Sequence, residues 1–135
     1  MMNTAVAISM LMIFALGTDG LRRQGQPVVS QNKFFCNVKA LTPTERARHK
    51  ELTAKLLVER KESVETQTGY EFQFNPKNVS LMELADWVAA ESKCCSFLDF
   101  HIDVEAEGNL LCLRLTGAQG VKDFIRSEFS VKNGR

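Results

Sequence analysis

The sequence has few of the residues that mark nucleic-acid-binding proteins and histidine-based enzymes. Its 135 residues include only two histidines, and 17 Lys and Arg are almost balanced by 16 Asp and Glu, which leaves a net charge of +1. The basic residues are spread along the chain, whereas a nucleic-acid surface needs clustered positive charge. We therefore expect no binding to nucleic acid, and the length predicts a single domain.

The first 17 residues have no charged side chain. Residues 4–17 read TAVAISMLMIFALG, an apolar run that is shorter than the roughly 20 residues of a membrane-spanning helix. Such a run is typical of a secretory signal peptide, and Ala15 and Gly17 place small residues before a cut after Gly17. We predict a signal peptide over 1–17 and export to the periplasm or the extracellular space, with no membrane span after its removal. An uncleaved N-terminal anchor or a buried helix is the alternative, with a cytoplasmic or N-terminally anchored location.

The remaining chain divides into a linker, a domain and a short tail. Residues 18–35 are polar, contain Gly20, Gly25 and Pro27, and show no periodicity, so they are predicted to form a flexible linker. The domain is expected over 36–131, and residues 132–135 form a tail.

Two capping boxes predict the starts of two helices. Thr42 and Glu45, with Pro43 at the first helical position, predict a helix to about residue 60, and Ser80 and Glu83 predict a second helix to about residue 95. The first helix has a narrow apolar stripe and is expected at the surface. The second has the clearest amphipathic pattern and is expected at the centre.

Alternating apolar residues predict two hairpins and a final helix. The first hairpin covers 63–75 with its turn at Thr68 and Gly69, and the second joins strands 100–105 and 110–115. The last strand is apolar on both faces except at Arg114, so it is expected inside the sheet. A short helix is predicted over 121–129. The order α-β-β-α-β-β-α predicts an α+β fold with a four-stranded, largely antiparallel sheet and helices packed on one face.

Two adjacent thiols, Cys94 and Cys95, stand at the predicted end of the second helix. Glu91 lies three and four residues before them, so its carboxylate can reach either sulfur on a helix. Thiolates select soft divalent ions, and a tetrahedral site needs about three of them with one further ligand. Cys36 is the candidate third thiol. We predict a metal site made by Cys36, Glu91, Cys94 and Cys95 for an ion of the Zn, Hg or Cu type, although the usual zinc spacing C-x-x-C is absent.

Other roles for the cysteines remain open. A disulfide from Cys36 to Cys94 or to Cys95 would make the cluster a structural staple, and export favours it. A Cys94–Cys95 disulfide is possible but strained, and it would be a redox device if present. Cys95 is expected to face the core and Cys94 to be the freer sulfur, while Cys112 in its apolar strand is expected to be a small core residue.

The two histidines do not indicate a catalytic base. His49 falls on the apolar stripe of the first helix and is expected to be packed, and His101 falls on the polar face of its strand. A nucleophilic cysteine needs a base within reach, so the sequence gives no support for an enzyme.

Three segments together resemble an uncharacterised bacterial domain family. They are Asn37–Lys55 (NVKALTPTERARHKELTAK), Glu91–Phe100 (ESKCCSFLDF) and Leu113–Phe124 (LRLTGAQGVKDF). The family pattern is E-R-x-C-C-P-F-L-x-F with L-T-G-P-x-G-V-K, and Ser96 and Ala118 stand where it has prolines.

Similar segments follow the DNA-binding part of some mercury-resistance-type regulators. The resemblance implies a heavy-metal or thiol-sensing role for Cys94 and Cys95, with Cys36 as a partner, and no known enzyme activity.

Overall fold

The computed structural model describes residues 34–132, and the predicted signal peptide, most of the predicted linker and most of the tail lie outside this range. The described chain forms three α-helices and one four-stranded sheet, with two short 3-10 turns. The elements in chain order are the turn Val38–Ala40, α1 (Pro43–Glu59), β1 (Arg60–Glu65), β2 (Gly69–Phe74), α2 (Leu81–Cys94), β3 (Leu98–Glu105), the turn Ala106–Gly108, β4 (Leu110–Gly117) and α3 (Val121–Glu128). This confirms the predicted α+β fold and its element order.

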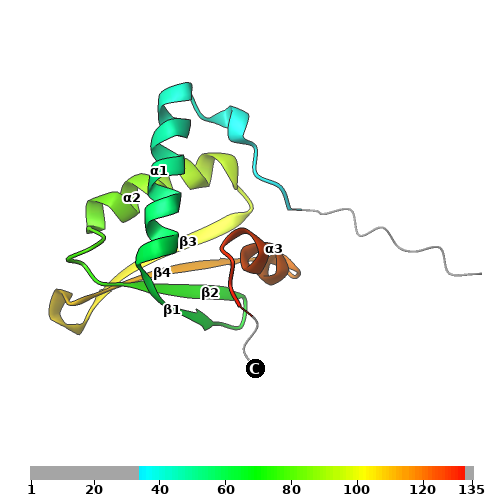
Figure 1. The fold of residues 1–135 in the computed structure, drawn as a ribbon. Coiled ribbons are helices and arrows are strands. Elements are labelled where there is room, and N and C mark those ends of the chain that lie inside the picture. The colour runs from blue at the N-terminus through cyan, green and yellow to red at the C-terminus, as the bar shows by residue number, and fades with distance from the viewer. Residues whose placement is uncertain (1–33, 133–135) are drawn as a thin grey trace, which may run out of the picture. The chain divides into compact units, whose positions relative to one another are not determined.

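The sheet is antiparallel throughout and has the strand order β1-β2-β4-β3. Strand β4 therefore lies between two neighbours, as its apolar sequence predicted. Figure 1 shows α1 and α2 together on one side of the sheet, with α3 close to the ends of β2 and β4. The end of α2 and the start of β3 are brought beside the segment that enters the domain.

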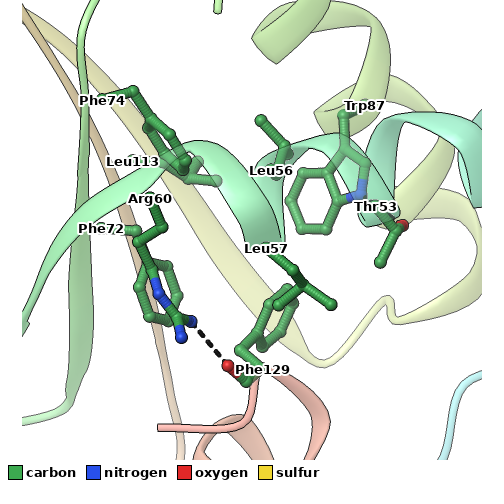
Figure 2. Close-up of a pocket in the computed structure, with 9 residues that line it drawn as sticks. All are labelled: Thr53, Leu56, Leu57, Arg60, Phe72, Phe74, Trp87, Leu113 and Phe129. Atoms are coloured by element: carbon green, nitrogen blue, oxygen red, sulfur yellow. Dashed lines mark hydrogen bonds between the residues drawn. The ribbon is translucent and has the colours of Figure 1, made fainter.

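The core fills the space between the helices and one face of the sheet. Alternate residues of β2 and β4 point into it and are buried: Tyr70, Phe72, Phe74, Leu111, Leu113 and Leu115. Trp87 of α2 is completely buried above them. Figure 2 shows the residues that surround a cavity in this core, whose volume is about 10 Å³. That is about the space of one water molecule, so this cavity is a packing feature and not a substrate site.

Two strands begin earlier than predicted. β1 begins at Arg60, immediately after α1, and not at Ser63; β3 begins at Leu98 and not at Phe100. Arg60 is held there because its guanidinium donates to the Phe129 carbonyl at 2.5 Å and lies over the Phe72 ring. Figure 2 shows this bond between two of the residues that line the cavity. The prediction missed this start because the anchor comes from the other end of the chain.

Both predicted capping boxes are formed. Thr42 and Ser80 accept hydrogen bonds from the third residue of their helices, and the carboxylates of Glu45 and Glu83 accept from the cap residues' backbone N–H groups. Glu83 also accepts from Lys55 of α1 at 2.7 Å, and this bond is the main reason that its pKa is lowered from 4.5 to about 2. The start of α2 is thereby tied to α1.

We expect thermal stability to fall as the pH is lowered from about 5 to about 2, with Glu83 as one contributor. Because the folded-state pKa of Glu83 is depressed, its contribution is complete above its unfolded value of 4.5 and is lost as the pH falls through about 2. Melting curves of the wild type and Glu83→Gln across this range measure the effect. The variant should show a weaker acid dependence, and equal slopes would contradict this role of Glu83.

Candidate thiol and carboxylate site

Residues 34–37, the segment that enters the domain, are attached to the end of α2. The backbone N–H of Asn37 donates to the Cys94 carbonyl at 2.7 Å, and Cys36 forms a disulfide with Cys95. Cys95 is the C-cap of α2, with its N–H bonded to the Glu91 carbonyl. Of the pairings that the sequence left open, the structure has Cys36–Cys95.

The packed part of the described chain begins before Cys36. The ring of Phe34 lies 5.1 Å from that of Phe97 and 6.4 Å from that of Phe124, measured between ring centroids, and the side chain is buried. Aromatic pairs at these separations stabilise a contact beyond simple burial. Phe34 and the disulfide therefore hold the same short segment at two points.

The four residues predicted to bind a metal ion lie together. One ligand atom from each of Cys36, Glu91, Cys94 and Cys95 lies within 4.8 Å of all the others. The Cys94 sulfur is 3.9 Å from the Cys95 sulfur and 3.7 Å from Glu91 Oε2. Sulfur atoms that share one tetrahedral ion are separated by about 3.5–4 Å. The cluster could therefore hold a metal ion, and the ligand role of each residue stays a prediction.

The cluster is enclosed by the protein. The side chains of Cys94 and Cys95 are buried and Glu91 is only 6% exposed, while Cys36 is partly exposed. The pKa of Cys94 is raised to about 11, first by burial and then by the negative charge of Glu91. Cys94 is thus a free thiol, while Cys95 is bonded, but Cys94 is enclosed and protonated at neutral pH.

Cys112 is the other free thiol of the described residues, and it lies away from this site. It is completely buried in β4, opposite Gln73 and Asp103 of the neighbouring strands. Its pKa is also raised to about 11, first by burial and then by the charges of Glu71 and Glu105. Cys112 is buried, as predicted. It is not part of the main core cluster, which includes its chain neighbours Leu111 and Leu113.

His49 is a residue of the site that the sequence did not reveal. Its Nε2 makes a hydrogen bond with Glu91 Oε2, the same oxygen that lies beside Cys94. The imidazole stacks on Trp87, with 5.9 Å between centroids, and Thr53 donates to the His49 carbonyl at 2.8 Å. His49 was correctly expected to be packed. Its partner could not be identified because Glu91 is 42 residues away in the chain.

His101 is exposed on β3, as predicted from its place on the polar face. It lies opposite Arg114 of β4. It therefore does not serve the thiols, and His49 is the histidine that adjoins them.

Comparison with known proteins identifies no relative. No protein-family model matches the chain, and no curated protein or solved structure shows significant similarity to it. In the part of the chain that the structure describes, none of the helices has the length and apolar character needed to cross a membrane. The family resemblance stays a prediction.

Proposed function

We propose that the protein is a small binding module whose reduced thiols take one soft divalent ion of the Zn, Hg or Cu type. The observation that carries the proposal is the convergence of three sulfurs and one carboxylate, from two segments far apart in sequence, within 4.8 Å. Three thiolates and one oxygen complete the four ligands of a tetrahedral ion. Enclosure of the cluster favours retention of such an ion against water.

The protein has an oxidised state with the Cys36–Cys95 disulfide and a reduced state without it, and the two states offer different metal ligands. Cys36 and Cys95 cannot bind an ion through thiolates while they are bonded to each other. The oxidised state therefore has only the Cys94 thiol in the cluster, and the reduced state has three. Ion binding by the Cys36 and Cys95 thiolates is not possible while these two residues form a disulfide, so uptake by the three thiols depends on the redox conditions.

A second candidate is a structural or interaction domain stapled by its disulfide, without a catalytic role. The Cys36–Cys95 bond and the hydrogen bond from Asn37 to Cys94 favour it, since together they fasten the entering segment. Export to an oxidising compartment, as the apolar N-terminal run predicts, would keep this bond closed. Intact mass with and without reductant tests the second candidate, which predicts that the chain before reduction is two hydrogen atoms lighter than the reduced chain.

The proposal is tested by titrating the reduced protein with zinc and mercuric ions against a coloured chelator. The wild type should take one ion per chain, and the double variant Cys94→Ser/Cys95→Ser should lose this uptake. Cys112→Ser is the matched control, because it also removes a buried thiol but leaves the cluster intact. Unchanged stoichiometric uptake by the double variant would overturn the proposal.

A further inference from the structure

We propose a second metal-binding arrangement, in which His49, Glu91 and Cys94 hold one divalent ion while the Cys36–Cys95 disulfide is closed. This arrangement uses neither of the bonded sulfurs. It therefore stands or falls independently of ion uptake by the three reduced thiols.

The carboxylate of Glu91 contacts both of the other donor groups. Glu91 Oε2 makes a hydrogen bond with His49 Nε2 and lies 3.7 Å from the Cys94 sulfur. An ion entering between them would replace the hydrogen bond by two metal–ligand bonds, with the imidazole and carboxylate moving apart. The donors come from α1 and α2, which pack against each other.

The mixture of donors suits zinc. Zinc accepts cysteine sulfur, histidine nitrogen and carboxylate oxygen, and sites with three protein ligands keep a fourth position for water or another small ligand. The three-thiol cluster, by contrast, fills all four positions with protein atoms. The oxidised protein would thus hold a more open site than the reduced protein.

The surroundings of His49 provide both rigidity and an entrance. Its ring is fixed by stacking on Trp87, whose indole N–H is in turn bonded to Thr53 Oγ1 at 2.9 Å. The His49 side chain is 18% exposed and lines two surface depressions, of about 230 and 620 Å³. The smaller depression is also lined by Glu45 and Asp86, which form ion pairs with Lys93 and Arg48 of the same depression. An ion can therefore reach the imidazole from solvent, although Glu91 and Cys94 are buried.

The test uses the full chain with its disulfide intact, confirmed by intact mass, and no reductant. Zinc affinity is measured by chelator competition, and cobalt is used as a spectroscopic probe. The wild type should bind one ion per chain and show the near-ultraviolet sulfur-to-cobalt band of a single thiolate. His49→Gln and Cys94→Ala should each weaken zinc binding by more than about 100-fold, since even residues that merely orient ligands are worth 10–100-fold.

Two controls separate ligation from loss of structure. His101→Gln removes the exposed histidine of β3 and should leave affinity unchanged. Gln at position 49 retains an N–H that can donate to Glu91, so His49→Gln should keep the wild-type fold and disulfide, as checked by circular dichroism and mass. Absence of binding to the oxidised wild type, or wild-type affinity in a folded His49→Gln variant, would overturn this inference. Neither result bears on uptake by the reduced protein, which is measured separately.

Discussion

Replacing Cys36 by Ser will lower the free energy of unfolding of the oxidised protein by about 4 kcal/mol. The Cys36–Cys95 bond joins residues that are 59 positions apart, and closing a loop of that length removes much of the conformational freedom of the unfolded chain. Cys36 is the suitable position because it is partly exposed, whereas a change at the fully buried Cys95 would also disturb packing. Chemical denaturation in the presence of a metal chelator measures the difference.

Reduction of the wild type supplies the control for this variant. With reductant present, wild type and Cys36→Ser should unfold at closely similar denaturant concentrations, and reductant should not affect the variant. An oxidised wild type that is no more stable than Cys36→Ser would show that the bond contributes nothing to stability. Since small domains have only about 5–15 kcal/mol in total, a loss of this size would be a large part of the stability.

The stability of the entering segment and the availability of the thiols are therefore linked by one bond. When Cys36 and Cys95 are bonded, the segment from Phe34 to Asn37 is fixed to α2 by covalent, aromatic and backbone contacts. When they are reduced, an ion shared by the same sulfurs would restore a cross-link between the same two places in the chain. On this proposal, the metal ion and the disulfide are alternative cross-links. Metal binding should therefore recover part of the stability that reduction removes.

The fold could be predicted because its signals are local. Capping boxes at Thr42 and Ser80 lie within four residues, and alternation along β2 and β4 reports directly which side chains are buried. The predicted start of β1 was wrong, because the observed start depends on the hydrogen bond from Arg60 to the carbonyl of Phe129, a contact across 69 residues. A periodic pattern contains no information on such a contact.

The same distinction explains the site. Glu91 and Cys94 are neighbours at the end of α2 and Cys95 is its C-cap, so spacing alone predicted that they would meet. The choice of Cys95 over Cys94 as the partner of Cys36 depends on the path of the entering segment, which is set by the bond from Asn37 N–H to the Cys94 carbonyl. The sequence could not predict His49 as part of the site, because the packing of α1 on α2 decides which side chain of α1 faces Glu91.

Replacing His49 by Phe will destabilise the oxidised protein by about 3 kcal/mol, the lower end of the range for stranding one member of a buried pair. Phe keeps an aromatic ring over Trp87 but cannot hydrogen-bond to Glu91, whose side chain is only 8% exposed. The carboxylate would then remain enclosed beside Cys94 with its main partner removed. Chemical denaturation without added metal measures this cost.

A double-mutant cycle shows whether the cost comes from the stranded carboxylate or from altered packing of α1 on α2. In the background of Glu91→Leu, His49→Phe no longer leaves a buried carboxylate, so it should cost about 2 kcal/mol less than it does in the wild type. If His49→Phe costs the same in both backgrounds, His49 acts by shape alone. The two side chains would then have no coupling energy, and the position of Glu91 beside Cys94 would not depend on His49. A clear coupling energy would instead mean that α1 supplies the group that fixes the carboxylate at the sulfurs, so the site is a property of the packed helix pair and not of the Cys-Cys segment alone.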